Sequence, residues 1–425
     1  MAELATGPTK CGVYRASCVM HEANSPLDTV CAGWSVSDER RATSDAEPCS
    51  LYVHVPVCRS KCRYCGFYSV PADGVDAGRL VDGLLRELDR HDGVEFSTAY
   101  IGGGSPTALP AGELVRLAGA VGQRAPRVAE FTVECNPGQV DAGLLTALRA
   151  VGVNRISFGA QSFLERELGL LGRKHSVAQI AAAVAMARRA GFENVGLDLI
   201  FAIPGSTLAD WRTSLEAAIE LGAEHVSAYG LSFEAGTPFE AERRAGRLAP
   251  VDEELDRAMY EWTIDRLARA GLEQYEISNF AKPGFECRHN LGYWANRPYV
   301  GVGPAAASYR TEGAAPGGRR IENDANVERY LDAVEYGRAA PSQAHMVNGD
   351  DAVCETAVLN LRRRAGIDLA EFRRRTGHDA MRTFAGPIGR YGGLGLIEVT
   401  DRAVRLTRRA LPIADTILCD FAALE

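Results

Sequence analysis

The sequence has no hydrophobic run long enough to cross a membrane. A membrane-spanning helix needs about 20 consecutive apolar residues, and neither such a run nor the hydrophobic stretch of a secretory signal occurs here. An excess of positive charge is also absent, since 47 Lys and Arg stand against 55 Asp and Glu and give a net charge of −8. No global field therefore attracts nucleic acid phosphates or anionic lipid. We expect a cytoplasmic protein that does not bind nucleic acid.

The cysteines are not arranged as in a disulfide-stabilised domain. The chain has 11 of them, an odd number spread unevenly over 425 residues, whereas small secreted domains carry dense, paired cysteines. Cys11, Cys18, Cys31 and Cys49 stand at wide, irregular intervals that match no common metal-binding pattern, so we interpret these four as incidental. The other cysteines are expected to be reduced thiols, metal ligands or both.

A chain of 425 residues exceeds what a single hydrophobic core usually fills, and four regions can be distinguished. Residues 1–49 show no sustained period and predict a loosely ordered leader, in which Met20 is an alternative start. Residues 50–280 predict the core, and residues 281–349 a connection that contains a Gly/Pro-rich hairpin. Residues 350–425 predict a compact helical domain with a two-stranded wing.

Short apolar runs alternate with longer amphipathic stretches in the core region, which is typical of strand, helix, strand units. Strands are predicted at 51–55, 99–101, 131–134, 155–159, 195–203 and 225–231, and helices at 79–90, 111–121, 141–151, 177–190, 208–221 and 255–270. Six such units predict an α/β fold with a parallel sheet that forms an open or partial barrel. Ligands are then expected just past the carboxyl ends of the strands.

The strongest local signal is the segment CRSKCRYC, directly after the first predicted strand. It places Cys58, Cys62 and Cys65 in C-x3-C-x2-C spacing on a loop flanked by basic residues. Three thiolates at this spacing can bind three irons of a [4Fe-4S] cluster and leave the fourth iron open to a small chelating molecule. The alternative is a zinc site closed by His54, because three sulfurs and one imidazole also make a tetrahedron. The place of His54 within the strand weighs against zinc.

Glycines and polar residues end the later strands. The segment GGGSPT at 102–107 lets the backbone approach a ligand where a Cβ would collide, although such a turn is also common as a tight connection. Glu134, Gln161 and Arg173 each have an ordinary explanation as capping or solvated groups. Asp198 differs because it interrupts an apolar strand, where a buried carboxylate costs several kcal/mol unless it is hydrogen bonded. We expect a ligand hydroxyl or amine to supply that bond.

In this order, CRSKCRYC, GGGSPT, ECNP and NRISFGAQSF resemble the radical S-adenosylmethionine (SAM) superfamily. Within it, the chain is similar to the branch that contains oxygen-independent coproporphyrinogen III dehydrogenase and the heme chaperone HemW. The resemblance covers residues 51–425 and includes RHNLGYW and ETAVLNLRRRAGIDLAEF. It implies a partial (βα)6 TIM-like barrel with a small C-terminal helical, winged-helix-like domain. It also implies that SAM chelates the open iron and is cleaved by one electron to a 5′-deoxyadenosyl radical.

The resemblance also implies cofactor-binding residues, but no catalytic residue. Cluster ligation is implied for Cys58, Cys62 and Cys65, and SAM contacts for Tyr52, Tyr64, Gly103, Gly104, Ser105 and Glu134, the last holding the ribose or amino group. Gln161, Arg173, Asp198 and Gly230 match positions that hold a second SAM in the dehydrogenase. Arg173 and Asp198 could equally serve a heme or substrate carboxylate.

Two departures distinguish members of this branch. The dehydrogenase has a fourth cysteine two positions after the third, where this chain has Phe67, which favours the HemW-like members. RHNLGYW resembles an element whose histidine is implicated in heme binding, so His289 is a candidate axial heme ligand. A hydrogen-bonded histidine without that role is the alternative. Ala306 and Ala307 stand where many relatives have a histidine, whose role is therefore not carried over.

The leading hypothesis is a heme chaperone of porphyrin metabolism that binds one heme, a [4Fe-4S] cluster and SAM. It would transfer heme to an acceptor protein, membrane-associated acceptors included, with flavodoxin or ferredoxin as a candidate electron donor. The rival is a radical enzyme, either the dehydrogenase or a methyltransferase that uses two SAM molecules. A DNA-binding role for the wing and for the arginines at 362–364 and 373–375 is disfavoured, because these alternate with acids and predict a solvated helix face.

Overall fold

The computed structural model describes residues 49–311 and 316–424. They fall into two compact units, one of residues 49–311 and 318–347 and one of residues 316–317 and 348–424. Cys11, Cys18, Cys31 and Met20 lie outside the described residues. Cys49, expected in the leader, is instead the first residue of strand β1 (Cys49–Val55), because it pairs with Phe96 of the neighbouring strand.

The larger unit is built on a twelve-stranded sheet with the order β14-β13-β12-β11-β1-β4-β5-β6-β7-β8-β10-β9. All six predicted strands are present as β1, β4 (Phe96–Gly103), β5 (Glu130–Cys135), β6 (Arg155–Gln161), β7 (Asn194–Phe201) and β8 (His225–Gly230). They run parallel to one another, and β11 (Tyr299–Val302) joins β1 in the same direction. The α/β class with a parallel central sheet is therefore confirmed.

Antiparallel strands flank the parallel ones at both edges of the sheet. They are β12 (Ala307–Thr311), β13 (Gly318–Asn323) and β14 (Ser342–Val347) beside β11, and β10 (Asn279–Ala281) and β9 (Glu273–Gln274) beside β8. The hairpin expected in the connecting region is thus a continuation of the sheet. No pairing between described residues joins β14 to β9, so the barrel is partial, as expected.

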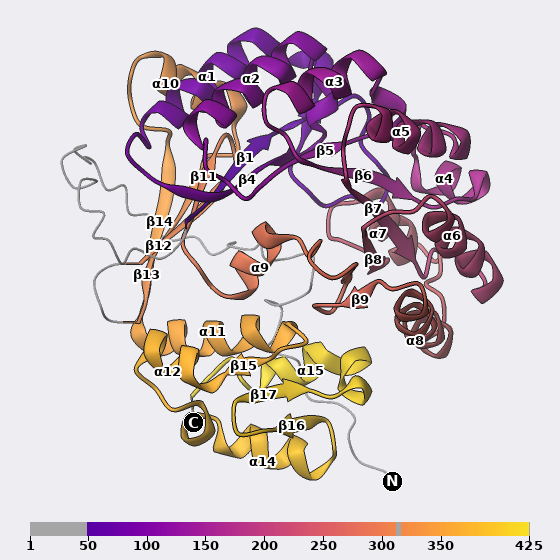
Figure 1. Ribbon diagram of the computed structural model, residues 1–425, viewed down its shortest axis with the longest axis vertical. Coiled ribbons are helices and arrows are strands. Elements are labelled where there is room, and N and C mark those ends of the chain that lie inside the picture. Colours follow the sequence, from indigo (N-terminus) through magenta and orange to yellow (C-terminus); the bar gives the residue numbers. More distant parts are fainter. Residues whose placement is uncertain (1–48, 312–315, 425) are drawn as a thin grey trace. The chain divides into compact units, whose positions relative to one another are not determined.

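Helices form an outer arc around this sheet (Figure 1). The six predicted helices are α1 (Ala77–Asp89), α2 (Ala111–Arg124), α3 (Ala142–Ala150), α5 (Val177–Arg189), α6 (Leu208–Glu220) and α8 (Glu253–Arg269). Four of them are followed by a glycine with positive φ, at Gly152, Gly191, Gly222 and Gly271, which satisfies the carbonyls of the last turn. The short helices α4 (Glu165–Leu171), α7 (Pro238–Arg244) and α9 (Arg288–Trp294) were not predicted, because seven residues show too little of a helical period. Helix α10 (Val327–Glu335) packs on α1.

The two faces of the central strands differ in chemistry, because successive side chains of a strand point to opposite faces. One face is aliphatic and fully buried, and includes Val53, Ile101 and Leu197. The alternate positions are polar, and include Thr98, Glu130, Thr132, Arg155, Ser157, His225 and Ser227, all buried. Helix α9 packs on β4 on the polar side. In most parallel sheets both faces are covered by aliphatic packing. The buried polar face of this sheet therefore indicates an interior that binds a ligand.

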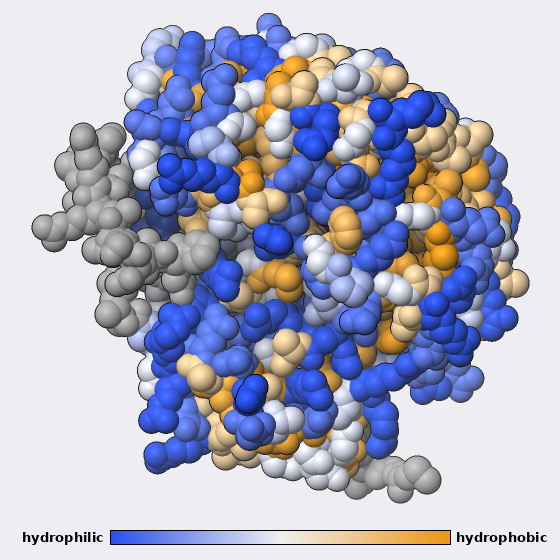
Figure 2. All heavy atoms as spheres, in the orientation of Figure 1, coloured by the Kyte–Doolittle hydropathy of each residue, from blue (hydrophilic) through white to orange (hydrophobic). Residues whose placement is uncertain are grey.

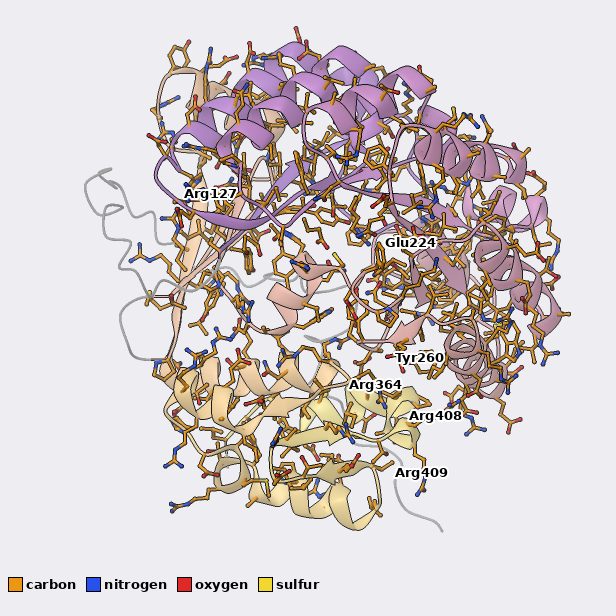
Figure 3. All side chains as sticks on the ribbon, viewed as in Figure 1. Arg127, Glu224, Tyr260, Arg364, Arg408 and Arg409 are labelled. Carbon is orange, nitrogen blue, oxygen red and sulfur yellow. The ribbon has the colours of Figure 1, made fainter. Side chains whose placement is uncertain are left out.

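The amino ends of β7 and β8 are fastened by one carboxylate, that of Glu224, labelled in Figure 3. Its Oε2 accepts hydrogen bonds from the Val195 amide (3.1 Å) and from Arg188 of α5 (2.7 Å), and its Oε1 accepts one from Lys282 (3.2 Å). A buried carboxylate with three donors is well compensated for its lost hydration. This end of the sheet is therefore held by structural contacts.

The smaller unit contains helices and a short antiparallel sheet. The helices are α11 (Gly349–Arg362), α12 (Leu369–Thr376), α13 (Ala380–Thr383), α14 (Ala385–Gly393) and α15 (Ala414–Cys419), and the strands are β15 (Ile367–Asp368), β16 (Ile397–Val399) and β17 (Ala403–Leu406). The predicted two-stranded wing is present as β16 and β17, with β15 as a third strand too short to predict. Phe372, Phe384 and Phe421 form its buried aromatic centre.

The arginines at 362–364 do not form the solvated helix face that the sequence predicts. Arg362 is only 3% exposed and lies 3.4 Å from Asp415. Arg363 donates to the side chain of Asn360 (2.8 Å), and Arg364 donates to the Leu406 carbonyl (3.2 Å). The run is structural because its side chains close the end of α11 and join it to β17 and α15.

The face of the molecule in Figure 2 is mostly hydrophilic, with small separate hydrophobic areas. Among the described residues, no helix is both long enough and apolar enough to span a membrane.

Candidate functional site

The carboxyl ends of the parallel strands lie side by side, because neighbouring strands pair in register. They form one edge of the sheet, across the strand direction and distinct from the lateral edges made by the antiparallel strands. Val55 of β1 pairs with Gly103 of β4, and Phe201 of β7 pairs with Gly230 of β8. The cysteine loop that follows β1, the segment GGGSPT after β4, and Glu134, Gln161 and Asp198 on β5, β6 and β7 therefore share this edge. The sequence motifs that lie far apart along the chain are brought to one site.

The cysteine loop, residues 58–65, is closed at its base by the paired strands β2 (Val57–Cys58) and β3 (Val70–Pro71). Its thiols, of Cys58, Cys62 and Cys65, are free and partly buried. Burial is the main cause that raises the pKa of the Cys65 thiol to about 11, and the neighbouring Cys62 and Cys58 contribute to this rise. Three sulfur donors on one partly exposed loop are the ligand set of an iron-sulfur cluster.

The zinc alternative fits the geometry less well. His54 is buried below the loop, where its Nδ1 lies 3.2 Å from the Tyr52 hydroxyl and its Nε2 lies 3.4 Å from the Tyr68 carbonyl oxygen. Among the described residues, no three His, Cys, Asp or Glu side chains converge as on a single metal ion. A [4Fe-4S] cluster does not require convergence, since each thiolate binds a different iron.

The glycine segment after β4 fits tightly against the cysteine loop. A Cβ on Gly104 would lie 2.7 Å from the Val57 carbonyl oxygen and 3.1 Å from the Cys58 sulfur, and one on Gly103 would lie 2.9 Å from the His54 ring. The amides of Gly104 and Ser105 donate to the carbonyls of Val55 and Val57. These amides are therefore used within the protein, and the glycines serve the close approach of two backbones.

The side chains of Ser105 and Glu134 differ in how well they can bind a ligand. The Ser105 hydroxyl donates to Gln139 (3.2 Å), which also binds Thr107. The Glu134 carboxylate accepts a hydrogen bond from the Tyr100 hydroxyl (2.7 Å), while burial raises its pKa to about 7. A carboxyl group that titrates near neutrality can either accept or donate a hydrogen bond, which suits a hydroxyl or amine ligand.

The protein itself supplies hydrogen bonds to the Asp198 carboxylate, and the further bond that we expect from a ligand stays a prediction. Both carboxylate oxygens of Asp198 accept from the Ser157 hydroxyl at 3.3 Å, and Ser227 hydrogen bonds to it as well. Burial nevertheless raises the pKa of Asp198. The two serines compensate the carboxylate because the alternating strand pattern places them on the same face of β6 and β8.

Arg173 reaches the cysteine loop. One guanidinium nitrogen, Nη1, lies 3.4 Å from the Cys62 sulfur, and Nη2 donates to the Gly159 carbonyl (2.7 Å). Gln161 is next to it and has a left-handed backbone with φ of 68°, which costs a non-glycine residue about 1 kcal/mol or more and is common at functional sites. Gly230 ends β8 and is exposed, with the Phe201 ring 3.3 Å from the position a Cβ would take.

Tyr52 and His289 lie deeper, on the polar face of the sheet. His289 is 1% exposed, its Nδ1 lies 2.8 Å from the Thr98 hydroxyl, and its Nε2 lies 3.1 Å from the Tyr293 hydroxyl. Its ring stacks on Tyr100 with 4.9 Å between centroids, and Tyr52 lies 6.4 Å away. Burial lowers the pKa of His289 to about 3, so the ring is neutral. This arrangement favours the hydrogen-bonded alternative, because neither ring nitrogen is free for iron.

Glu130 holds the start of α9 on the sheet. Its carboxylate accepts hydrogen bonds from the amides of Arg288 (2.9 Å) and His289 (3.0 Å) and lies 3.4 Å from the Cys287 sulfur. Sequence reasoning missed Glu130, together with Tyr100, Ser157 and Ser227. The signal was available, since polar residues at every second position of the strand segments EFTVEC and RISFG indicate a polar inner face.

The comparisons with known proteins agree with this geometry. A model of the radical SAM superfamily matches residues 52–218, and a model of the HemN C-terminal domain matches residues 347–413. The structure is similar to coproporphyrinogen III oxidase (HemN) from Escherichia coli, with a TM-score of 0.75, 22% sequence identity, and 91% of this chain and 92% of that chain covered. The fold and the three-cysteine loop define a radical SAM protein, a class that uses a [4Fe-4S] cluster and SAM.

Curated relatives narrow this class further. A Bacillus subtilis protein named heme chaperone HemW is 34% identical over 379 residues, which cover 88% of this chain and 98% of that protein. The proteins of the same name from Lactococcus lactis and Escherichia coli are 35% and 39% identical, covering 77% and 61% of this chain and 84% and 69% of theirs. The chain belongs to the HemW family.

Proposed function

We propose that this protein is a heme chaperone, which binds one heme together with a [4Fe-4S] cluster and SAM and transfers the heme to an acceptor protein. The observation that carries the proposal is the similarity to the Bacillus subtilis protein named heme chaperone HemW, of which 98% is covered. Phe67 adds support, since its side chain is 47% exposed where the dehydrogenase has a fourth cysteine.

The cluster is assigned to Cys58, Cys62 and Cys65, whose loop is braced by Gly104 and contacted by Arg173. When bound, the cluster with SAM would supply one-electron chemistry. Of the proposed SAM contacts, Tyr64, Gly103, Gly104, Ser105 and Glu134 border the loop or the same edge of the sheet. Glu134 is the best placed to bind a ribose hydroxyl or an amine, because its carboxyl titrates near neutrality. Tyr52 lies deeper, and its hydroxyl contacts His54.

The proposed heme ligand, His289, is not free to bind iron in the folded protein. For His289 to bind heme iron, its ring must leave Thr98 and Tyr293, and α9 must leave the sheet. Such a movement would cost the hydrogen bonds that Glu130 makes to the α9 amides. We therefore propose heme binding with His289 as a ligand only in a rearranged state.

The partners proposed from the sequence are the heme acceptor, a membrane-associated protein included, and a one-electron donor such as flavodoxin or ferredoxin. The exposed part of the cysteine loop supports a protein donor, since Arg59, Lys61 and Phe67 are exposed around the thiols. Basic residues around an apolar side chain suit the acidic surface of a small redox protein.

The rival proposal of a two-SAM enzyme has less support. It relies on Gln161, Arg173 and Asp198 as a second SAM site, yet Arg173 contacts Gly159 and Cys62, and Asp198 contacts Ser157. Product formation from a candidate porphyrin or methyl acceptor would favour the enzyme, because a chaperone yields nothing beyond slow abortive 5′-deoxyadenosine.

The test is an anaerobic hemin titration of the cluster-reconstituted protein, followed in the Soret region, for the wild type and for His289→Ala. Saturation near one heme per chain supports the chaperone, and weaker binding by the variant places the ligand at His289. Saturation that is unchanged in the variant supports a chaperone with another ligand. Lack of saturable binding by the wild type would overturn the proposal.

A further inference from the structure

Arg63 stands between two residues of the proposed cofactor site, Cys62 and Tyr64, and is only partly exposed. Its amide donates to the Leu171 carbonyl (3.0 Å), and its Nη1 donates to the Leu170 carbonyl (3.4 Å). Both carbonyls belong to the last turn of α4, where they have no partner within the helix. Backbone and side chain of Arg63 thus cap the same helix end.

The other side of Arg63 faces α7. The Phe239 amide donates to the Arg63 carbonyl (3.1 Å), and Nη2 of Arg63 forms an ion pair with Glu242 (2.6 Å). The guanidinium carbon also lies 5.3 Å from the centre of the Phe239 ring, within the range of a cation–π contact. Arg63 is therefore bonded to two helices, α4 and α7, that are about 70 residues apart in the chain.

Arg63 packs closely against the end of α4. Gly172 follows the helix with φ of 79°, and a Cβ there would lie 3.1 Å from Cγ of Arg63 and 3.4 Å from its amide nitrogen. Below, Leu171, Ile200, Ile203 and Phe239 form a buried cluster against which Tyr64 packs. Both neighbours of the Arg63 backbone are thus held as well, Tyr64 by packing and Cys62 by Arg173.

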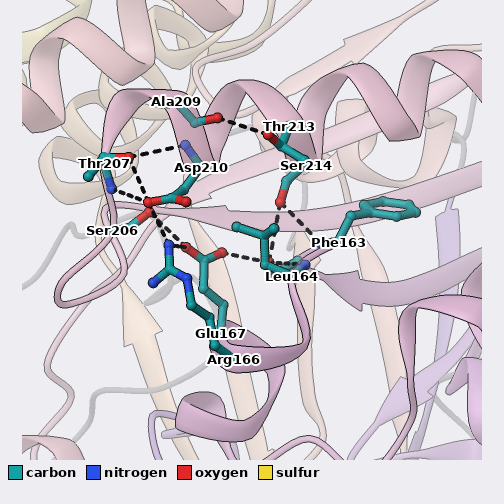
Figure 4. A network of polar contacts seen from close by, with 11 residues as sticks. Phe163, Leu164, Arg166, Glu167, Ser206, Thr207, Ala209, Asp210, Thr213 and Ser214 are labelled. Carbon is teal, nitrogen blue, oxygen red and sulfur yellow. Dashed lines mark hydrogen bonds and ion pairs between the residues drawn. The ribbon is translucent and has the colours of Figure 1, made fainter.

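Helix α4 is itself held by hydrogen bonds and an ion pair to neighbouring elements. The buried carboxylate of Glu167 accepts from Ser162 (2.6 Å) after β6 and from Ser206 (2.8 Å) after β7, and Arg166 pairs with Asp210 of α6 (Figure 4). The Ser214 hydroxyl, also of α6, accepts from the Phe163 amide. These bonds join the first turn of α4, and the residues just before it, to α6 and to the segments that follow β6 and β7, and so help to fix the helix that the loop contacts.

We propose that Arg63 is a positioning residue, whose side chain clamps the cysteine loop between α4 and α7 and so presets the spacing of Cys62 and Cys65 for cluster binding. The inference rests on the proposed cluster site, but not on heme binding. The proposal also gives a role to the segment FEAGTPFEAER, residues 233–243. This segment supplies Phe239 and Glu242, which contact the Arg63 side chain from α7.

The test compares Arg63→Ala with Arg59→Ala, its matched control. Arg59 has the same side chain on the same loop and is exposed, and among the described residues no hydrogen bond or ion pair joins it to α4 or α7. Iron and sulfide content, the rate at which a chelator removes iron from the reconstituted protein, and the EPR spectrum of the reduced cluster are measured. Thermal unfolding of the cluster-free proteins shows whether each variant folds.

We expect iron loss from Arg63→Ala to be about fivefold faster than from Arg59→Ala, with an altered EPR spectrum, because the ion pair with Glu242 and the side-chain hydrogen bond to the Leu170 carbonyl are lost together. Arg63→Lys should be intermediate, since one ammonium cannot serve both Leu170 and Glu242. Equal rates and spectra for the two alanine variants would overturn the proposal.

Glu242→Gln keeps the test decisive if Arg63→Ala does not fold, because it removes only the charged partner of Arg63. Faster iron loss than in Arg59→Ala would support the clamp, and wild-type behaviour would overturn the role of α7. A wild-type protein that holds no cluster would instead refute the cluster site itself. Absence of heme binding by a cluster-loaded wild type would refute the chaperone proposal and leave the clamp intact.

Discussion

The cysteine loop and helix α9 carry the two motifs that resemble a cofactor site. Their candidate ligand atoms differ in exposure. The thiols of Cys58, Cys62 and Cys65 are partly exposed and free, on a loop braced by α4, α7 and the glycine segment. His289 on α9 is buried, and both ring nitrogens have partners within the protein. The loop therefore presents partly exposed donor atoms to a cofactor, whereas α9 does not.

A cofactor motif in a sequence therefore does not reveal whether its donor atoms are available to a ligand. When a metal replaces solvent at thiols on such a loop, little conformational entropy is lost, because contacts with the rest of the protein already hold the loop in place. A buried histidine must first give up its hydrogen bonds, each of which costs about 1 kcal/mol or more to break.

The largest effect is expected for Cys62→Ala. Removal of one of three thiolates should abolish stable cluster binding, because no fourth cysteine follows on the loop. Iron and sulfide content and visible absorbance after reconstitution are the measurements. Cys419→Ala, in the smaller unit, is the control and should retain the cluster. Full iron and sulfide content in Cys62→Ala would refute the site.

Glu130→Ala should release α9 from the sheet. The variant leaves the amides of Arg288 and His289 without their acceptor, which should lower the free energy of unfolding by about 3 kcal/mol. Urea unfolding of the cluster-free protein measures this, with exposed Glu193→Ala as the control. If heme requires the rearranged state, Glu130→Ala should bind heme more tightly than the wild type. A loss of heme affinity would contradict that requirement.

The pH dependence of stability reports on the buried ring of His289. Its pKa in the folded protein is about 3, below the value near 6.5 of an unfolded histidine. The contribution of the neutral ring is complete above pH about 6.5 and is lost as the pH falls from there towards 3. His289→Asn should therefore reduce the slope of unfolding free energy against pH in this window by up to about 1.4 kcal/mol per pH unit. An unchanged slope would mean that His289 titrates normally.

Arg173→Met should change the cluster without removing it. The guanidinium lies 3.4 Å from the Cys62 sulfur, and a positive hydrogen-bond donor beside a ligand sulfur favours the reduced, more negative cluster. The midpoint potential, measured by EPR during redox titration, should become more negative in the variant, while Arg173→Lys should keep part of the effect. Equal potentials in all three proteins would show that Arg173 does not act on the cluster.

The smallest effect is expected for Tyr293→Phe, which removes the hydroxyl at Nε2 of His289 and nothing else. The cost should be about 1 kcal/mol in unfolding free energy, with cluster content unchanged. If heme ligation requires a free Nε2, the variant should also bind heme faster than the wild type. Slower binding would indicate that Tyr293 contacts heme itself.

Much of the fold could be predicted because its signals are local. Six strands and six helices of the larger unit were predicted to within a few residues, since apolar runs, amphipathic periods and terminal glycines mark them. The helices α4, α7, α9 and α10 were not predicted, and two of them, α4 and α7, contact the cysteine loop. Helices of seven residues have too little periodicity to be seen without their tertiary contacts.

Within the site, the cysteine loop, the glycine segment, their order along the chain and the family could all be recognised without a structure. These follow from short motifs, in which residue type and spacing already state the chemistry. The hydrogen bonds from serines to Asp198, the contact of Arg173 with Cys62 and the position of Arg63 between two helices became visible only in the folded chain. The same holds for the burial of His289, whose partner Thr98 is 191 residues away in the chain. Such contacts depend on which strands become neighbours, and no local pattern carries that information.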